Sequence, residues 1–426
     1  MINVVVVLAM SFLNFFLCLN ATELTISQAG IYQLGAPILT SPTTADNIIN
    51  ITASDVVLDL GGYVISQANG TANVAGIVVN QNLSDIVIRN GTIRSVTGTG
   101  ISLLATDSRI RISNILFENC AGAGMAADGS AGTITDLELT QCRFYGCSST
   151  GTSVILWNNV SRSSIVNCII DGTINTAAAF TCINLLTCTS CTMNDITIQN
   201  NTTLNNSALF SAINENSTFY NYFSNVIIRN NTSGASANFN GFNTTGTSSL
   251  YLNCSIVGNF GGGANNAFNL NSTTGNLYRQ CQIINNTAQS GTLSGFRESS
   301  PGNQNIFTDC TANVGSSSST GVFFNLNSLG SIVARCTASN ILVGIGLSVP
   351  STVQKLTVFD CLFSKLGTGV QDAVSTTGDL YYRNVAFNNS AAQFSGVGFS
   401  ATTPGAPATQ NIAAVTQPWT NLAIAA

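Results

Sequence analysis

Histidine is absent from this chain of 426 residues. Its absence excludes Ser-His-Asp and Cys-His catalytic sites, histidine-ligated zinc and an imidazole general base. Charge is scarce as well: Asp, Glu, Lys and Arg make up only 7% of the residues, against about 25% in an ordinary soluble domain. The net charge of −5 offers no basic surface, so we expect neither nucleic acid nor an anionic membrane surface as a partner.

Hydrophobic residues nonetheless make up 45% of the chain, and glycine contributes 38 residues. A chain that is rich in Ile, Val, Leu and Phe and poor in charge can bury a core, so the composition argues against disorder. The length alone suggests more than one domain, but an internal repeat takes precedence over that estimate.

The only long apolar run lies at the N-terminus, between Val4 and Leu19. Ala21 provides a small residue where a signal peptidase would cut, so residues 1–21 are predicted to be the signal peptide of a secreted or cell-surface protein. An uncleaved anchor is the alternative, although a membrane span needs about 20 apolar residues and this run is shorter. We expect no membrane span after signal cleavage.

A short pattern recurs along the rest of the chain: apolar residues, then Asn or Cys, then one residue and usually another apolar one. The recurring column consists of Asn90, Asn114, Cys142, Cys168, Asn225, Cys254, Cys281, Cys310, Cys336, Cys361 and Asn384, with Asn194 as its least certain member. The intervals of 23 to 31 residues are too short for a βα unit with a full helix. Three short β-rich stretches per repeat predict a parallel β-solenoid with one coil per repeat, or about 12 coils.

Asn and Cys suit this column for mechanical reasons. Asn tolerates the left-handed conformation of a sharp turn, and its amide can hydrogen-bond the amide stacked above it. Cys behaves as a small hydrophobe that fills an inward position. A second column five residues later contains Asn119, Cys147, Asn230, Asn259, Asn286 and Asn389, and we interpret both columns as structural ladders.

The few charges support the same register. Opposite signs follow one another at equivalent positions of successive coils, where side chains about 5 Å apart attract. The predicted charge ladder consists of Asp309, Arg335, Asp360 and Arg383 in the last coils, and of the early pairs Asp85 with Arg109 and Arg94 with Glu118. We interpret these residues as solvent-facing ion pairs that play no part in catalysis.

Twelve of the 13 cysteines lie beyond the N-terminal run, which in a secreted chain suggests disulfides. Stacked, in-register parallel neighbours seldom orient suitably for an S–S bond, so the cysteine column is predicted to be a ladder of free, buried thiols. Cys182, Cys188 and Cys191 lie outside the column and are left open to include one disulfide. A metal site is the alternative for the column, although its spacing provides no second Cys pair and no histidine.

Residues 55–66 read Asp-Val-Val-Leu-Asp-Leu-Gly-Gly-Tyr-Val-Ile-Ser. This run resembles the first segment of secreted right-handed parallel β-helix proteins of the pectate-lyase-like superfamily, which commonly carry a string of the type VTLDLNGHTI there. Gly61 and Tyr63 replace the usual Asn and His. The resemblance covers residues 22–395 and implies an all-β chain: an N-terminal cap and first turn at 22–84, a single right-handed parallel β-helix at 85–395, and a C-terminal cap or tail at 396–426.

The superfamily includes lyases, hydrolases, epimerases, phage tailspikes and adhesins, so the resemblance alone does not fix an activity. Lyase chemistry, as the resemblance implies it, needs several carboxylates around calcium and an Arg or Lys base. The acids without an evident partner are spread over the early coils with no two or three in one column: Asp107, Asp128, Asp136, Glu138, Asp171, Asp195 and Glu215. The adjacent Asp pair and the histidine that polygalacturonase-like members use are absent.

We therefore expect a secreted or surface-exposed scaffold without catalytic or metal-binding residues, which binds glycans or has an adhesive or structural role. Outward Asn, Thr, Ser and Tyr side chains match sugar hydroxyls, so a surface polysaccharide or host glycan is the expected partner. Trimers recur among tailspike-like members, and the resemblance extends the expectation to a homotrimer. The alternative is a polysaccharide lyase or glycoside hydrolase for acidic polysaccharide, and calcium is expected as a cofactor only in that case.

Overall fold

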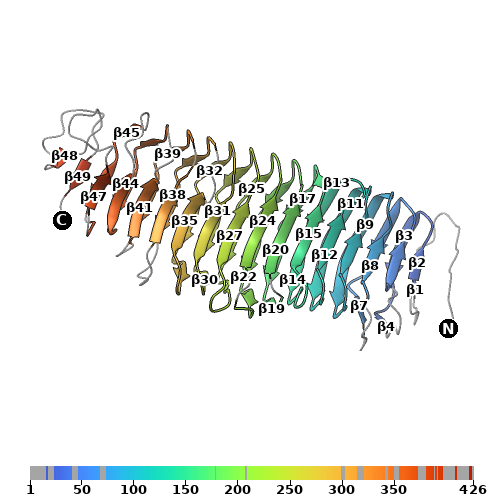
Figure 1. Cartoon of the computed structure of the whole chain (residues 1–426). Coiled ribbons are helices and arrows are strands. Elements are labelled where there is room, and N and C mark those ends of the chain that lie inside the picture. The colour runs from blue at the N-terminus through green and yellow to red at the C-terminus, as the bar shows by residue number, and fades with distance from the viewer. Residues whose placement is uncertain are drawn as a thin grey trace. The chain divides into compact units, whose positions relative to one another are not determined.

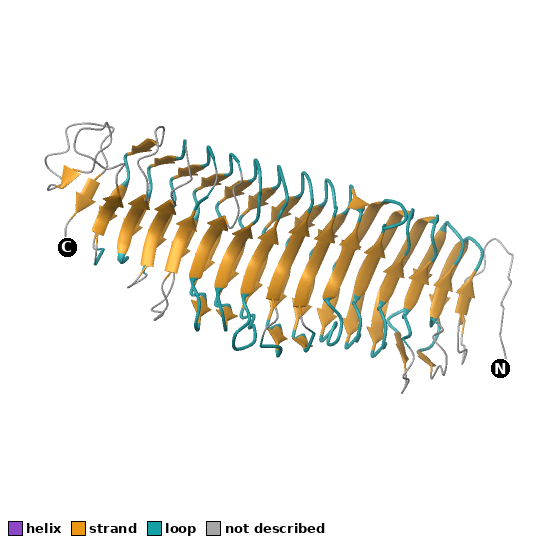
Figure 2. Cartoon of the chain, viewed as in Figure 1, coloured by secondary structure: helices purple, strands orange, loops and turns teal. Residues whose placement is uncertain are grey.

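The computed structural model describes residues 16–17, 24–40, 47–67, 73–177, 179–206, 209–298, 303–313, 321–327, 329–340, 344–349, 355–372, 380–387, 389–390, 392–396, 408–409 and 422–424. The chain divides into two compact units, Met1–Leu204 and Asn205–Ala426, called unit 1 and unit 2 below. The described residues form strands joined by short loops and contain no helix (Figure 2). The predicted fold class is confirmed: the protein is an all-β parallel solenoid of about 12 turns.

Unit 1 winds through three parallel sheets, in which strands of successive coils lie side by side (Figure 1). The first sheet contains β1 (Phe16–Leu17), β3 (Gly30–Leu34), β6 (Val56–Asp59), β9 (Ser84–Arg94), β11 (Ser108–Glu118), β13 (Ile134–Thr140), β16 (Val160–Ser161), β17 (Ser164–Val166) and β21 (Thr192–Asn194). The second contains β4 (Ile38–Thr40), β7 (Val64–Gln67), the ends of β9 and β11, β14 (Arg143–Tyr145), β18 (Ile169–Asp171) and β22 (Thr197–Gln199). The third contains β2 (Leu24–Ile26), β5 (Ile49–Ile51), β8 (Ile77–Val79), β10 (Ile101–Leu103), β12 (Met125–Asp128), β15 (Ser153–Asn158) and β20 (Ala179–Leu186), and β19 (Ile174–Asn175) pairs with β23 (Thr202–Thr203).

Unit 2 has the same three kinds of sheet. The first contains β25 (Tyr222–Ser224), β28 (Leu250–Leu252), β32 (Leu277–Arg279), β36 (Ile306–Thr308), β39 (Ile332–Ala334), β42 (Thr357–Phe359) and β45 (Leu380–Tyr382). The second contains β26 (Ile227–Arg229), β29 (Ser255–Val257), β33 (Gln282–Ile284), β37 (Thr311–Asn313), β40 (Thr337–Ser339), β43 (Leu362–Ser364), β46 (Val385–Phe387), β48 (Ala408–Thr409) and β49 (Leu422–Ile424). The third contains β24 (Leu209–Asn216), β27 (Phe239–Thr244), β31 (Asn265–Leu270), β35 (Leu293–Glu298), β38 (Gly321–Asn325), β41 (Gly344–Val349), β44 (Thr368–Asp372) and β47 (Ala392–Gly396), and β30 (Phe260–Gly261) pairs with β34 (Thr287–Ala288).

The segment for which the sequence predicts an N-terminal cap contains regular coils wherever the structure describes it. Leu24 pairs with Ile49, and Ile49 pairs with Ile77 in the next coil. The strands of the other two sheets pair in parallel in the same way. The predicted signal peptide lies outside the described residues except for the backbone of β1, and most of the predicted C-terminal cap or tail also lies outside them.

Buried and exposed side chains alternate along the strands, and the buried ones form the core. In β11, Ile110 and Ile112 are buried whereas Arg109 and Arg111 face solvent, as expected from the two-residue period of a strand. In unit 2 the inward positions hold two columns of rings stacked from coil to coil at 4.6–5.3 Å between centroids: Phe223, Tyr251, Tyr278 and Phe307 in one, and Phe242, Phe268, Phe296 and Phe324 in the other.

The Asn/Cys column of the sequence is two neighbouring columns in the structure. The first holds residues in the left-handed region, with φ between 51° and 60°: Asn90, Asn114, Gln141, Asn167 and Asp195 in unit 1, and Asn225, Asn253, Gln280, Asp309, Arg335, Asp360 and Arg383 in unit 2. The second follows one residue later and points inward: Cys142 and Cys168 in unit 1, and Cys254, Cys281, Cys310, Cys336, Cys361 and Asn384 in unit 2. The single ladder predicted from the sequence was therefore wrong by one residue at several of its members.

The left-handed turn is the reason for this correction, because it directs its own side chain outward and the next one into the core. Asn114 donates its amide to Asn90 at 3.0 Å, as predicted, and Asn253 donates to Asn225. Leu116 pairs with Arg143, so Asn114 aligns with the turn residue Gln141. Cys142 follows that turn by one residue. The uncertain member Asn194 ends β21, one residue before the turn at Asp195.

The second predicted column divides in the same way. Asn119 and Asn230 have left-handed φ, whereas the inward positions hold Cys147, Asn259, Asn286 and Asn389. Buried asparagines link the coils: the Asn231 backbone N–H donates to Asn259 Oδ1, and the Asn259 N–H donates to Asn286 Oδ1, both at 2.9 Å. Each buried amide thus satisfies backbone groups that water cannot reach.

All twelve cysteines in the described residues are free and buried, including Cys182, Cys188 and Cys191. The open possibility of a disulfide among those three is not realised in the structure. Burial holds the pKa values of Cys281, Cys310, Cys336 and Cys361 well above the usual range. These thiols are therefore protonated packing groups at neutral pH.

Candidate functional site

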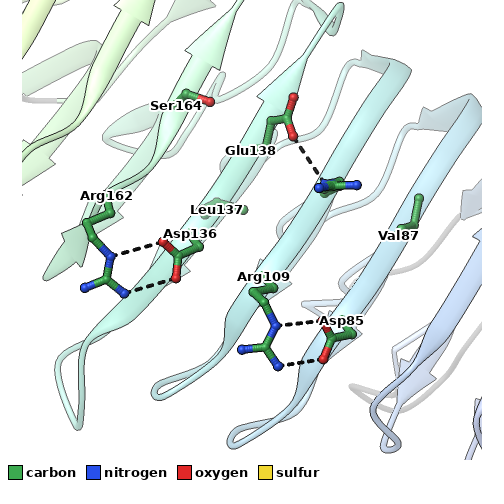
Figure 3. A pocket seen from close by; sticks show the side chains of 9 residues that line it. Asp85, Val87, Arg109, Asp136, Leu137, Glu138, Arg162 and Ser164 are labelled. Carbon is green, nitrogen blue, oxygen red and sulfur yellow. Dashed lines mark hydrogen bonds and ion pairs between the residues drawn. The ribbon is translucent and has the colours of Figure 1, made fainter.

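An open groove with a volume of about 460 Å³ crosses the outer face of the first sheet of unit 1 (Figure 3). It spans β9, β11 and β13 and reaches the start of β17. Its lining consists of Asp85, Val87, Arg109, Arg111, Asp136, Leu137, Glu138, Arg162 and Ser164. Six of these nine side chains are charged, in a chain with very little charge, which is why we regard the groove as the candidate functional site.

Two bidentate ion pairs form one edge of the groove. Arg109 Nε and Nη2 lie 2.7 and 2.6 Å from the Asp85 carboxylate oxygens, and Arg162 contacts Asp136 at 3.1 and 3.0 Å in the same way. All four residues have left-handed φ values, between 49° and 59°, so they occupy one stacked turn. The sequence paired Asp85 with Arg109 but found no partner for Asp136.

A looser ion pair also lines the groove. Arg111 Nε is 3.4 Å from Glu138 Oε2, and the two side chains are 71% and 47% exposed. Both are outward residues of adjacent strands, since Arg111 pairs with Glu138 in the register of β11 and β13. This pair presents hydrogen-bonding groups to solvent with little to hold them in place.

The two bidentate ion pairs determine the protonation state of their carboxylates. The hydrogen bond from Arg109 lowers the pKa of Asp85 to about 2, and the hydrogen bond from Arg162 lowers the pKa of Asp136. Both carboxylates are therefore ionised at neutral pH and cannot supply the proton that glycosidic cleavage requires. They can accept hydrogen bonds, while the guanidinium groups donate them.

The other predicted charge-ladder residues also lie in contact. Arg94 is 2.6 Å from Glu118, Arg335 is 2.7 Å from Asp309, and Arg383 is 2.6 Å from Asp360. The structure also gives Arg partners to acids for which the sequence analysis found none, because Arg111 contacts Glu138 and Arg143 contacts Asp171. Asp171 further accepts hydrogen bonds from Gln199 and Asn200.

Unit 2 contains a buried polar cluster that was not predicted from the sequence. The Glu215 side chain is 1% exposed and accepts hydrogen bonds from Thr218 at 2.8 Å, Asn221 at 3.0 Å and Thr244 at 3.0 Å, and also from Tyr251. The strand pattern held a usable signal, because Glu215 follows Ile213 at a spacing of two and so lies on the inward face. Its hydrogen bonds satisfy a carboxyl group in the core.

The part of the chain that the structure describes contains no group of three or more His, Cys, Asp or Glu side chains arranged to hold a metal ion. Among the same residues, no helix has the length and hydrophobicity of a membrane-spanning segment.

Comparison with protein-family models and with curated proteins finds no match. Among solved structures, the chain is similar to the tailspike protein of E. coli bacteriophage HK620 in complex with a pentasaccharide, at 11% identity and a TM-score of 0.39 over 93% of this chain and 72% of the other. It is also similar to the A-module of the mannuronan C-5 epimerase AlgE4 of Azotobacter vinelandii, at 11% identity and a TM-score of 0.40 over 86% of this chain and 91% of that module. Likenesses of this size carry no conclusion about ligand or activity, and membership of the pectate-lyase-like superfamily remains a prediction.

Proposed function

We propose that the protein is a surface-exposed or secreted scaffold that binds a glycan in the charged groove of unit 1 without cleaving it. The observation that supports this most directly is the pairing of every carboxylate in the groove with an arginine. Such pairs offer adjacent donors and acceptors, which suits the vicinal hydroxyl groups of a sugar. The groove volume of about 460 Å³ lies within the range of small-molecule sites, about 300–1,000 Å³.

The lowered pKa values of the two carboxylates in the bidentate pairs support a non-catalytic role. A glycosidase needs one carboxyl group that is protonated near neutral pH beside one that is ionised. The low pKa values of Asp85 and Asp136 give no such contrast. No specific observation favours the alternative of a lyase or hydrolase, so that alternative enters only as an outcome of the test.

The test is glycan binding by the whole chain, with variants that separate the groove from the rest of the charge ladder. The fluorescently labelled protein is applied to a glycan array, and the glycans that bind are then titrated against Arg111→Gln, whose side chain is exposed in the groove. Arg335→Gln is the matched control, because it removes an exposed Arg–Asp pair in unit 2. We expect R111Q to weaken binding at least several-fold and R335Q to leave it unchanged.

The same glycans, incubated with the protein with and without calcium, are assayed for new reducing ends and for unsaturated uronates. Absence of products is expected. Products absorbing in the unsaturated-uronate band would overturn the non-catalytic proposal, and a protein that binds nothing on the array would overturn glycan binding.

Secretion and assembly form part of the same proposal. Expression of the full chain in a secreting host should release protein whose N-terminal sequence begins near residue 22. Light scattering during gel filtration then gives the mass of the assembly, for which a homotrimer is proposed. Retention of residues 1–21 in a membrane fraction would favour the uncleaved anchor instead.

A further inference from the structure

A second cluster of charged and aromatic side chains lies on the second sheet of unit 1, outside the groove. Tyr145 is 44% exposed and occupies the middle of an outward column. The strand register places Glu118 beside it in the preceding coil and Asp171 beside it in the following coil. An exposed aromatic ring therefore stands between two carboxylates.

The ring of Tyr145 lies against Gly172 and close to Arg143. Gly172 has φ of +66°, and a Cβ built there would lie 2.8 Å from Tyr145 Cε2, so the ring lies directly against the glycine backbone. The Arg143 guanidinium carbon lies 6.0 Å from the ring centroid, and Arg143 Nη2 is fixed 3.1 Å from Asp171 Oδ2. These neighbours restrict the ring, so it loses less conformational entropy when a ligand packs on it.

Hydrogen-bonding groups flank the ring on both sides. In addition to its contact with Arg143, Asp171 accepts hydrogen bonds from Gln199 Nε2 at 3.2 Å and from Asn200 Nδ2 at 3.0 Å. On the other side, Arg94 Nε lies 2.6 Å from Glu118 Oε2. Each carboxylate is thus neutralised by its own arginine, so the cluster has donors and acceptors but no net charge.

We propose that this cluster, called the Tyr145 platform, is a subsite for an uncharged pyranose ring of a polysaccharide. The apolar face of the sugar packs on the exposed part of the Tyr145 ring, and its hydroxyl groups bond to the Glu118 carboxylate and to the guanidinium groups of Arg94 and Arg143. Asp171, which is buried, holds Arg143 in place. Ile169, which is 38% exposed and lies beside Arg143 in the register of β14 and β18, extends the apolar surface. The absence of net charge favours a neutral sugar over a uronate or an amino sugar.

This inference rests on the proposed glycan binding and adds to it a site and a sugar class. The groove and the platform lie on opposite arms of β11, on either side of the left-handed turn at Asn114. They therefore face different directions and can be removed separately.

The test uses the full chain and the neutral oligosaccharides that bind on the glycan array, with dissociation constants measured by calorimetry. Tyr145→Ala should weaken binding about tenfold or more, Tyr145→Leu should weaken it nearly as much because the aromatic face is lost, and Tyr145→Phe should stay within about twofold. Tyr63→Ala is the matched control, since Tyr63 is a partly exposed tyrosine of unit 1 outside both sites. Circular dichroism melting of each variant verifies that the solenoid is folded, and Y145L provides the readout if Y145A fails to fold.

The outcomes separate the two proposals. Binding that Y145A and Y145L leave unchanged but R111Q weakens would overturn the platform and retain the groove. Exclusive binding of acidic glycans by the wild type would overturn the assignment of a neutral sugar. A wild-type protein that binds no glycan would overturn both proposals.

Discussion

The Tyr251 hydroxyl donates a hydrogen bond to the Glu215 carboxyl group in the core of unit 2. Both side chains are buried, and the Tyr251 ring is at the same time stacked between Phe223 and Tyr278. Burial raises the pKa of Tyr251 well above its usual value, and the nearby Glu215 raises it further. The hydroxyl is therefore protonated and able to donate at neutral pH.

Replacing Tyr251 by Phe should consequently destabilise the protein by about 1–3 kcal/mol, the cost of removing one hydrogen bond from a buried polar group. The measurement is the free energy of unfolding in urea. Tyr222→Phe is the control, because that tyrosine is partly exposed on the outer face of the neighbouring strand. Equal losses in the two variants would contradict a special role for the Glu215 cluster.

Asp107 should make stability depend on pH between about 4 and 7. Its side chain is fully buried, Oδ1 accepts the Leu83 N–H at 2.9 Å, and Oδ2 has no partner. Burial raises its pKa to about 7, whereas an unfolded Asp titrates near about 3.9. Between these values the folded state holds a proton that the unfolded state lacks, so stability falls as pH rises, by at most about 1.4 kcal/mol per pH unit.

Urea unfolding at several pH values from 4.5 to 8 measures this slope, and Asp107→Asn should flatten it. The absence of histidine keeps the window free of the side chain that ordinarily titrates there. A slope that persists unchanged in D107N would show that another group is responsible.

The ion-pair ladder should behave in the opposite sense. Arg109 lowers the pKa of Asp85 and Arg335 lowers that of Asp309, each to about 2. A depressed pKa contributes stability above the unfolded value of about 3.9, and that contribution is lost as pH falls through about 2. Carbon-13 NMR titration of the carboxyl groups should give these low values, and Arg109→Gln should return Asp85 towards 3.9 while Asp309 stays low.

The buried thiols should be inert in the folded protein. All twelve described thiols are buried and out of reach of a reagent. Burial also raises the pKa of Cys281, Cys310 and Cys336, so their reactive thiolate is scarce, whereas a hydrogen bond with Cys142 lowers the pKa of Cys168. We expect a disulfide reagent to modify native protein very slowly at pH 8. After denaturation it should titrate the twelve buried cysteines, and Cys18 as well where the N-terminal segment is retained. Fast reaction of the native protein, or bridged peptides after alkylation without reduction, would contradict the free thiol ladder.

The solenoid could be predicted from the sequence because each coil requires the same types of residue at equivalent positions. An outward residue at a sharp turn, an inward small residue after it and alternating strand positions recur at 23–31 residue intervals. The charge pairs helped with the register, since Asp85 and Arg109 are equivalent residues of adjacent coils. The sequence prediction combined two columns that lie one residue apart, because Asn suits both of them. Asn114 occupies an outward left-handed turn, whereas Asn384 lies in the inward column.

The candidate site was less accessible to sequence reasoning. Asp136 and Arg162 are 26 residues apart, and loops of variable length between them hide their equivalence. Arg111 and Glu138 are likewise separated by a coil whose length differs from that of the preceding one. The Tyr145 platform depends on the contact of the ring with Gly172, which no spacing rule reveals.

The two columns of stacked rings in unit 2 have a consequence for the evolution of the protein. Each ring contacts only rings of its own coil and of the adjacent coils, as Tyr251 does with Phe223, Phe242, Phe268 and Tyr278. A duplicated or deleted coil would present the same ring faces at the new junction. The chain can therefore lengthen or shorten by whole repeats during evolution without redesign of its core, and surface sites on separate coils can diverge independently.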